Sequence, residues 1–433
     1  MKYYSTNKQA PIASLQEAVV KGLASDKGLY MPERIKQLPD SFFEEMKDMS
    51  FQEIAYVVAD AFFGEDIEAD ILKSIVYDTL NFDTPIVQVK DNIYSLELFH
   101  GPTLAFKDVG ARFMARILAY FIKKQGLTDV NVLVATSGDT GSAVANGFLG
   151  VAGIRVFVLY PKGKVSSIQE CQFTTLGQNI TALEIDGTFD DCQRLVKSAF
   201  IDEELNKKLQ LTSANSINVA RFLPQAFYYF YAYAQLAKQG KAKNVVFCVP
   251  SGNFGNITAG LFGKRMGLPI KRFIAANNRN DIFLKYLQTK EYTPRPSVST
   301  IANAMDVGDP SNFARISDLY NNSHEDISKE ISGNKYLDED IRKTLKDCYK
   351  ETGYLLDPHG ACGYQALLDE LAPDETGIFL ETAHPAKFLE TVENIVEEKV
   401  EIPQKLQAFM QGKKQSIELS KEFEEFKRFL KEQ

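Results

Sequence analysis

The sequence is poor in the residues that bind metal ions or form disulfides. It has four histidines and five cysteines among 433 residues. They lie far apart along the chain, at His100, His324, His359 and His384 and at Cys171, Cys192, Cys248, Cys348 and Cys362. No CxxC pair and no HExxH spacing places two potential ligands side by side. We therefore predict neither a metal site nor a disulfide framework, and we expect the scattered histidines to be structural.

Long apolar runs and an excess of positive charge are also missing. No apolar stretch approaches the roughly 18 residues that a membrane span requires, and the first residues lead into polar sequence without an apolar secretory core. Asp and Glu (57) outnumber Lys and Arg (49), and the net charge of −8 disfavours binding to nucleic acid phosphates. We predict a cytoplasmic protein that contacts neither membranes nor nucleic acid and holds any anionic ligand with local donors.

The arrangement of apolar residues predicts an α/β protein. Hydrophobic residues make up 45% of the chain and charged residues 24%, which is typical of globular proteins. Short β-branched runs alternate with segments of helical periodicity, which indicates βαβ units and a mainly parallel sheet. The expected strands are 131–135, 155–160, 179–185, 244–249, 272–276 and 377–381. A helix is expected over 109–124, with Asp108 immediately before it as the N-cap residue.

The length of the chain predicts two or three domains. Residues 1–85 are expected to form a helical lobe, and 277–309, rich in Asn, Pro, Ser and Thr, a long insertion. The aromatic segment 226–237 is expected to be a helix buried in the core. A final amphipathic helix would present Leu419, Phe423, Phe426 and Leu430 on one face.

Lys107 is the first candidate for chemistry. It follows apolar Leu104, Ala105 and Phe106 and stands where a loop meets the start of a helix. Burial and the positive end of a helix both favour the neutral amine, which is the form that makes a Schiff base with an aldehyde. A solvated surface lysine is the alternative, and these residues alone leave both open.

Two turns between a strand and a helix are candidates for binding anions. Residues 251–256 (Ser-Gly-Asn-Phe-Gly-Asn) and 136–142 (Thr-Ser-Gly-Asp-Thr-Gly-Ser) each follow an expected strand. Glycines let a ligand approach the backbone, and the helix N-terminus offers free N–H donors. The first turn suits a phosphate and the hydroxyl-rich second turn a carboxylate, although a tight turn and simple N-capping remain the structural alternatives. Neither turn has the spacing of a dinucleotide site or a P-loop.

A fourth segment, 381–387, follows the last expected strand. Ligands bind at the carboxyl ends of strands in such sheets, and the Thr382 hydroxyl can donate or accept one hydrogen bond there. His384 in the same loop could serve as a general base, but a histidine before a proline is more often structural.

These segments, taken in order, resemble the threonine synthases, members of the fold type II (tryptophan-synthase β-like) enzymes that depend on pyridoxal phosphate. The resemblance covers most of the chain. It includes 4–6 with 22–30, 99–103 through Lys107-Asp108, 136–142, 215–218 with Arg221, 251–256, 303–308 and 381–387. It implies two open, mainly parallel α/β domains plus a small helical lobe at 1–85, a catalytic core over 86–400 whose smaller subdomain lies around 110–225, and a helical extension over 401–433.

The resemblance also implies roles for individual residues. Lys107 would carry the cofactor as a Schiff base and shuttle protons, Thr382 would bind the pyridine nitrogen, and Phe106 would pack near the ring. Asp139 would face the ring hydroxyl, where related enzymes often carry Asn. The cofactor phosphate would rest on Gly252, Asn253, Phe254, Gly255 and Asn256. The substrate carboxylate would be bound by Thr136, Ser137 and Thr140, and the substrate phosphate by Arg221 with Ser216 and Asn218.

The activity that the resemblance implies is threonine formation from O-phospho-L-homoserine by β,γ-replacement, the last step of threonine biosynthesis. Two alternatives stay open. One is a serine or threonine dehydratase of the same fold, which releases no phosphate from its substrate. The other is a non-catalytic α/β protein that uses the glycine turns to bind nucleotides. The oligomeric state is expected to be a monomer or homodimer.

Overall fold

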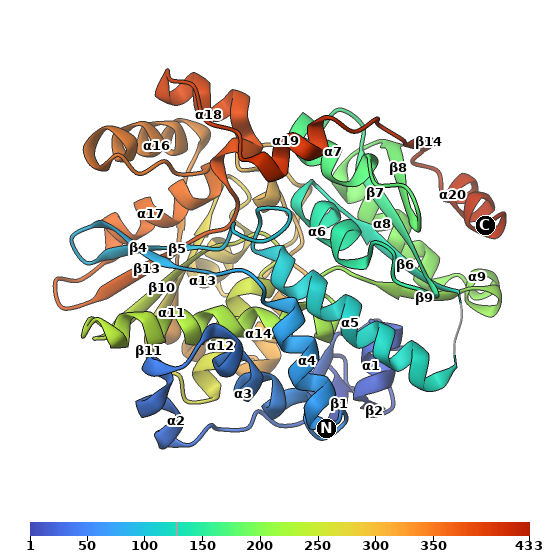
Figure 1. Cartoon of the computed structure of the whole chain (residues 1–433), viewed down its shortest axis with the longest axis horizontal. Coiled ribbons are helices and arrows are strands. Elements are labelled where there is room, and N and C mark those ends of the chain that lie inside the picture. Colours follow the sequence, from blue (N-terminus) through green and yellow to red (C-terminus); the bar gives the residue numbers. More distant parts are fainter. Residues whose placement is uncertain (127–128) are drawn as a thin grey trace.

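The computed structural model describes residues 1–126 and 129–433 and contains three sheets. Figure 1 shows the two larger sheets side by side, with the N-terminal segment beneath both. The strand order is β12-β11-β10-β13-β5-β4 in the large sheet and β14-β8-β7-β6-β9 in the small sheet. Every pairing in these sheets is parallel except that of β4 with β5. The predicted class, α/β with mainly parallel sheets, is confirmed.

The N-terminal segment combines helices with a short antiparallel sheet of order β2-β1-β3, which was not predicted. Its elements are β1 (Lys2–Ser5), β2 (Ala13–Ser14), α1 (Leu15–Lys21), β3 (Tyr30–Pro32), α2 (Asp40–Glu45), η1 (Met46–Asp48), α3 (Phe51–Phe63) and α4 (Ala69–Thr79). Ser14 and Ser50 start α1 and α3 as capping boxes, because each hydroxyl accepts from the backbone of a glutamate three residues on, Glu17 or Glu53, whose carboxylate accepts in return.

The large sheet is covered by helices of the C-terminal half. Its strands are β4 (Ile86–Lys90), β5 (Ile93–Glu97), β10 (Val245–Pro250), β11 (Ile270–Asn277), β12 (Ile331–Lys335) and β13 (Thr376–Glu381). The associated helices are α11 (Ala226–Lys238), α12 (Gly255–Arg265), α13 (Ile282–Thr289), η3 (Asn303–Met305), α14 (Phe313–Leu319), α15 (His324–Glu330), α16 (Asp338–Thr352), α17 (Pro358–Glu370), η4 (Pro385–Phe388) and α18 (Leu389–Val396). Every residue of β10 and β13 is buried, as expected for central parallel strands with both faces covered.

The small sheet is built mainly from the middle of the chain and completed by its end. Its strands are β6 (Val130–Ala135), β7 (Ile154–Pro161), β8 (Ile180–Asp186), β9 (Gln210–Ser213) and β14 (Ile417–Ser420). The helices are α5 (Lys107–Gln125), α6 (Asp139–Phe148), α7 (Ser167–Thr174), α8 (Phe189–Ile201), α9 (Glu203–Lys208), α10 (Val219–Phe222), η2 (Leu223–Gln225), α19 (Gln404–Met410) and α20 (Phe423–Lys431). Because β14 pairs with β8, the C-terminal extension is part of the sheet.

The six predicted strands are confirmed as β6, β7, β8, β10, β11 and β13. Three details were wrong. Asp108 does not cap α5, since the cap position is Phe106 and Asp108 lies inside the first turn. Leu419 belongs to strand β14 and not to the last helix. The insertion 277–309 contains α13 and η3 and is not wholly irregular, because apolar Ile282, Phe283 and Tyr286 bury one face of α13.

The aromatic helix α11 lies in the core, as predicted. Phe227, Tyr228, Tyr229 and Phe230 are fully buried. The hydroxyls of Tyr228 and Tyr229 donate to the Asn256 side-chain oxygen at 2.7 and 2.8 Å. The core thereby fixes the side chain of Asn256 at the start of α12.

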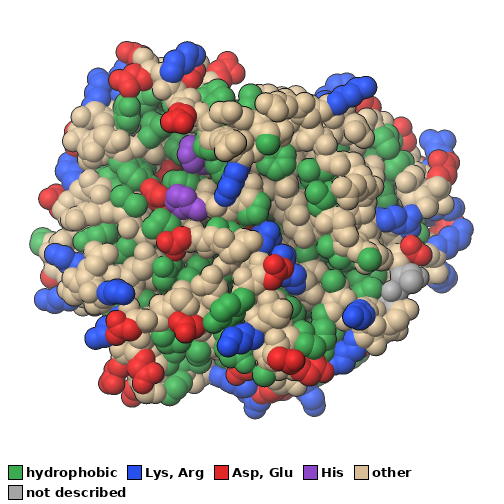
Figure 2. All heavy atoms as spheres, viewed as in Figure 1, with side chains coloured by type: hydrophobic (Ala, Val, Ile, Leu, Met, Phe, Trp, Pro, Cys, Tyr) green, Lys and Arg blue, Asp and Glu red, His purple; other side chains and the backbone are tan. Residues whose placement is uncertain are grey.

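The surface carries both signs of charge. On the face that Figure 2 shows, Lys and Arg are interspersed with Asp and Glu. None of the helices in the described ranges is long and apolar enough to cross a membrane. The same residues contain no group of three or more His, Cys, Asp or Glu side chains placed to hold a metal ion.

Candidate active site

The two sheets meet at a small cavity of about 90 Å³. Its wall includes most of the residues predicted to carry chemistry. From the prediction these are Phe106, Lys107, Ser137, Thr140, Ser216, Arg221, Gly252, Asn253, Phe254, Gly255, Asn256 and Thr382. They come from segments far apart in the sequence, and the carboxyl ends of β10 and β13 supply two of these segments, as expected for an open parallel sheet.

Lys107 is the first residue of α5 and lies in the cavity wall. Its ammonium lies 5.5 Å from the centre of the Phe106 ring. Burial lowers the pKa of the Lys107 amine to about 8; the charge of Asp139 opposes this effect, whereas the charges of Arg221 and Lys387 add to it. About a tenth of the amine is therefore neutral at pH 7, far more than for an ordinary lysine, and the neutral amine is the form that attacks an aldehyde.

The start of α5 is fixed by two sets of contacts. The Asp108 carboxylate accepts from the backbone N–H and the hydroxyl of Thr103, at 2.9 and 2.6 Å. Phe106 donates its N–H to the carbonyl of Thr382 at 2.9 Å. These contacts hold the loop before Lys107 against the strand end that carries Thr382, so both side chains open on the same cavity.

The turn between β10 and α12 has the features of a phosphate cradle. Phe254, the N-cap residue of α12, has a left-handed backbone (φ 61°). Among the described residues, the buried Asn256 amide nitrogen has no hydrogen-bond partner. Free donors at a helix N-terminus suit an anion, and the glycines let it approach the backbone.

Gly252 is required at its position by close packing. A Cβ atom at Gly252 would lie 2.6 Å from the carbonyl oxygen of Ala304 and 3.1 Å from the Cα atom of Met305. We expect Gly252→Ala to shift the turn and weaken phosphate binding by about 1–3 kcal/mol, the usual range for an added methyl in a packed site. Cofactor titration followed by absorbance measures the effect. Gly333→Ala, whose Cβ would make only ordinary contacts of 3.4 Å or more, is the control, and equal affinities for the two variants would contradict the prediction.

Arg221 reaches the cavity from α10 and is almost completely buried, with 2% of its surface exposed. Its Nε and Nη1 atoms have no hydrogen-bond partner among the described residues. Burial lowers the pKa of Arg221 to about 10, so the side chain is still cationic at neutral pH. A buried guanidinium with free donors is costly unless an anion binds to it. The wall of the cavity therefore contains an anion-binding group.

The hydroxyl-rich turn before α6 divides into two parts. Ser137 and Thr140 line the cavity. The Thr136 hydroxyl instead accepts from the N–H groups of Gly138 and Gly141, at 2.9 and 2.7 Å, and Thr136 does not line the cavity. It shapes the turn that presents the other two hydroxyls, and its predicted contact with a substrate carboxylate remains a prediction.

Of the two residues predicted to bind the substrate phosphate together with Arg221, Ser216 and Asn218, one lines the cavity and the other does not. Ser216 lines the cavity, and its hydroxyl accepts from the Asn312 amide at 3.0 Å. Asn218 caps α10, and its amide group donates to the carbonyls of Val19 and Ser213. Asn218 is therefore placed to hold α10, and through it Arg221, while lying outside the cavity wall.

Two residues of the site were not predicted from the sequence. His359 lines the cavity. Its Nε2 atom accepts a hydrogen bond from the backbone N–H of Ala304 at 3.1 Å, and its Nδ1 atom is hydrogen-bonded to the Asp357 carboxylate at 2.5 Å. It thus holds the loop that packs on Gly252.

Lys387 is fully buried and forms an ion pair with Asp139 at 2.6 Å. Segment 381–387 was predicted to contribute to the site, but through Thr382 and His384 and not through Lys387. His384 accepts from the backbone of Ala386, and burial lowers its pKa to about 4, consistent with the structural alternative.

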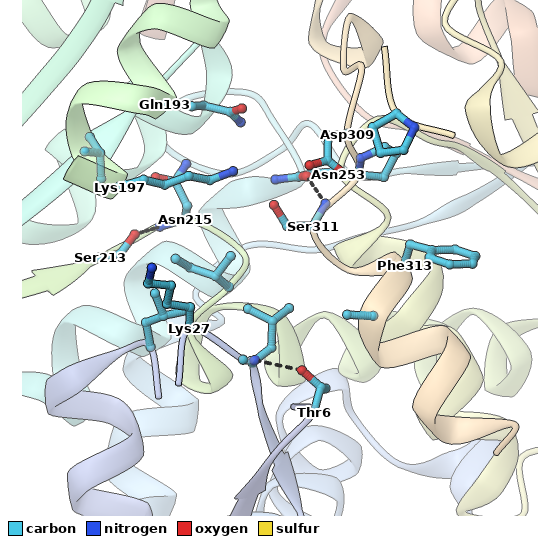
Figure 3. Close-up of a pocket in the computed structure, with 18 of the residues that line it drawn as sticks. Thr6, Lys27, Gln193, Lys197, Ser213, Asn215, Asn253, Asp309, Ser311 and Phe313 are labelled. Atoms are coloured by element: carbon cyan, nitrogen blue, oxygen red, sulfur yellow. Dashed lines mark hydrogen bonds between the residues drawn. The ribbon is translucent and has the colours of Figure 1, made fainter. Parts of the chain in front are cut away.

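A larger cleft of about 1170 Å³ adjoins the cavity, since Asn215 and Asn253 line both. Figure 3 shows residues of its walls. Thr6 and Lys27 come from the N-terminal segment, Gln193 and Lys197 from α8, Asp309 and Ser311 from the segment before α14, and Phe313 from the start of α14. Lys27 and Lys197 are exposed and form no ion pair with any described residue.

The residues around the cavity fit pyridoxal phosphate. A lysine with a lowered pKa is available for the aldehyde, a glycine turn with unpaired donors for the phosphate, and the Thr382 hydroxyl for the ring nitrogen. A hydroxyl at that place does not stabilise a protonated ring, unlike a carboxylate. The Nε and Nη1 atoms of Arg221, which have no partner among the described residues, remain available for a second anionic group.

Comparisons with known proteins agree with this geometry. The family described as pyridoxal-phosphate dependent enzyme matches residues 78–380, threonine synthase N terminus matches 2–80, and threonine synthase, C-terminal, matches 360–430. The chain is 44% identical to threonine synthase of Haemophilus influenzae, over 99% of each chain. It is 45% identical to that of Escherichia coli, over 94% of each chain.

Solved structures give the same result. The crystal structure of threonine synthase from Escherichia coli superposes with a TM-score of 0.95 at 42% identity and covers all of both chains. The pyridoxal-phosphate-bound threonine synthase from Brucella melitensis gives 0.92 at 35% identity, covering all of this chain and 99% of that one. With the family matches over most of its length, this shows that the chain belongs to the threonine synthase family of pyridoxal-phosphate enzymes.

Proposed function

We propose that the substrate is O-phospho-L-homoserine and that the products are L-threonine and phosphate. The observation that carries this proposal is the buried Arg221, whose free donors open on the same cavity as Lys107. The cofactor phosphate has its own place on the glycine turn, so Arg221 is available for a phosphate on the substrate. A dehydratase acting on serine or threonine has no such group to bind.

Each residue then has a defined part in the reaction. Bound pyridoxal phosphate supplies the electron sink for the charge that develops beside the substrate amino group. Lys107 holds the cofactor at the start, and its released amine takes the proton from Cα. Arg221, with Ser216, neutralises the charge that develops on the phosphate leaving Cγ. A second proton leaves Cβ as the phosphate departs, and a proton is then delivered to Cγ. Water adds at Cβ, and a proton returns from Lys107 to Cα.

The remaining residues orient the cofactor and the substrate. Gly252 to Asn256 bind the cofactor phosphate through backbone N–H groups, and Thr382 binds the ring nitrogen. Phe106 packs beside the ring, and Asp139 faces its hydroxyl. Ser137 and Thr140, presented by the turn that Thr136 shapes, bind the substrate carboxylate at the N-terminus of α6.

The decisive experiment supplies purified enzyme with O-phospho-L-homoserine and measures phosphate and threonine together. Equal amounts of the two products are expected. Serine and threonine are offered in parallel reactions. Deamination of either one, without phosphate release from phosphohomoserine, would favour the dehydratase alternative and overturn the proposal.

The adjoining cleft suggests a route for the substrate. Lys27 and Lys197 put two unpaired positive charges on its walls, whereas the protein as a whole is negative. We expect Lys27→Gln with Lys197→Gln to lower kcat/KM for the anionic substrate by roughly 10-fold at low salt, within the range of electrostatic steering. The effect should shrink as salt is added, because exposed charges are screened, and kcat should be unchanged. Lys243→Gln, an exposed lysine outside the cleft, is the control. A loss that persists at high salt would contradict steering.

The predicted domain limits at 85 and 400, the cytoplasmic location and the monomeric or dimeric state remain part of the proposal. Fractionation of the cells and ultracentrifugation of the purified enzyme test the last two.

A further inference from the structure

Lys387 has surroundings that are unusual for a lysine. It lies on η4 with none of its surface exposed, and its ammonium donates to the Asp139 carboxylate at 2.6 Å and to the Thr103 carbonyl at 2.8 Å. Lysine is almost never fully buried unless a charge compensates it. A neutral side chain would fill the same space without the cost of dehydrating an ion. The charge itself therefore calls for an explanation.

Asp139 completes a neutral unit with this lysine. Its Oδ1 atom also accepts from the Gln169 amide at 2.8 Å. Burial acts to raise the pKa of Asp139, but the charges of Lys387 and Lys107 and the hydrogen bonds from Lys387 and Gln169 outweigh it, so the pKa lies below its usual value. Asp139 is thus a carboxylate, and the pair carries no net charge.

The pair lies next to Lys107 and joins the two sheets. Asp139 begins α6, beside the small sheet, whereas Lys387 follows the last strand of the large sheet. The segment before Lys107 runs alongside the segment before Lys387. A β-bridge links Ala105 with Ala383, and His384 donates its N–H to Leu104 at 3.1 Å. Both members of the pair are close enough to act on the charge of Lys107.

We propose that Asp139 and Lys387 act as one neutral pair that sets the electrostatic balance at the Lys107 nitrogen and at the hydroxyl edge of the cofactor ring, which makes Lys387 a positioning residue of this active site. The proposal rests on the cofactor site of the proposed function but not on the identity of the substrate. Asp139 stabilises a positive charge at Lys107, and Lys387 opposes this effect in part, together with Arg221. A carboxylate can then face the ring hydroxyl without trapping Lys107 as a cation.

The other charged groups near Lys107 and Lys387 bear on the direction in which each single variant shifts the midpoint. Lys107 faces Asp139, Lys387 and Arg221. Lys387 in turn acts on Asp108 and His384 from η4. Removing one member of the pair, with Arg221 and these other groups unchanged, leaves the charge of the other member uncompensated beside Lys107. The two single removals must therefore have opposite effects.

The test uses the holoenzyme and three variants. The readout is the pH midpoint of the change in cofactor absorbance, which reports protonation at the Lys107 nitrogen. Asp139→Asn should lower this midpoint by about one unit, a tenfold change in the protonation equilibrium. Lys387→Met should shift it in the opposite direction, and by less, because Lys387 has the weaker effect on Lys107. The double variant, which removes both charges, should have a midpoint between those of the two single variants and recover part of the activity lost in Asp139→Asn. Lys343→Met removes an exposed lysine paired with Asp347 and should change nothing.

Several outcomes would overturn the proposal. One is a shift of the pH midpoint in the same direction for both single variants. Another is an unchanged midpoint in variants that retain full cofactor content. A third is a double variant whose midpoint differs from wild type by as much as that of the more strongly shifted single variant. If Lys387→Met does not fold, Asp139→Asn and the double variant still give the comparison, and Lys387→Arg, which keeps the charge, should keep the midpoint. Failure of phosphate release with normal midpoint shifts would instead count against the substrate alone.

Discussion

Replacing Lys107 by alanine will abolish cofactor attachment and lower the turnover of O-phospho-L-homoserine by at least about 10⁴-fold, the upper end of the range for one acid–base group. The loss is large because Lys107 both holds the cofactor and moves the Cα proton in the proposed reaction. Among the described residues that line the cavity, Lys107 is the one lysine, so the variant has no other amine there with a lowered pKa, about 8 in the wild type. Absorbance near the visible edge and phosphate release measure the two effects.

The control for this variant lies on the same helix. Lys123→Ala removes an exposed lysine near the C-terminal end of α5 and should leave both measurements unchanged. Borohydride reduction followed by peptide mapping gives an independent check, because the wild-type label should be found at Lys107 alone. A label on another lysine would exclude Lys107 from the assigned role.

The second large effect is expected at Arg221. Arg221→Ala should lower kcat/KM for O-phospho-L-homoserine by roughly 10²–10³-fold, as for the loss of one donor that stabilises developing charge. Cofactor absorbance should persist, because the cofactor phosphate rests on the glycine turn. Arg221→Lys should recover only part of the activity, since an ammonium keeps the charge but loses the bidentate geometry.

Folding must be separated from chemistry in this test. Arg221 packs against α5, where its Nη1 atom occupies the space beside Gly110, so Tm and cofactor content are measured for each variant. Arg342→Ala, an exposed arginine on α16, is the control. A folded Arg221→Ala enzyme with unchanged kcat/KM would remove this arginine from the substrate site.

Local sequence patterns predicted the strands, α5 and the glycine turn because each depends on a short stretch of chain. The β-branched runs at 131–135 and 244–249 indicate buried strands wherever they are placed, and glycine after a strand indicates a turn. The role of Asp108 was misjudged because a good capping residue next to a helix has the same local pattern whether it lies before or inside the first turn. Its actual partner, Thr103, is determined by the loop.

Long-range contacts could not be predicted in this way. Lys387 and Asp139 are distant in the sequence, and neither has a neighbour that indicates an ion pair. The same holds for Asn218, whose amide donates to Val19 in the N-terminal segment, and for His359 of α17, whose partner Ala304 belongs to η3. Their functions depend on which segments the fold brings together.

The final strand has a practical consequence for anyone who shortens or extends this polypeptide. β14 pairs with β8 along the outer side of the small sheet, and Lys427 and Lys431 of α20 form ion pairs with Asp202 and Glu204. A protein that ends before residue 417 would leave β8 with a row of unpaired backbone groups, which can pair with another molecule. Aggregation would then be the first sign of damage, although every residue around Lys107 would still be present.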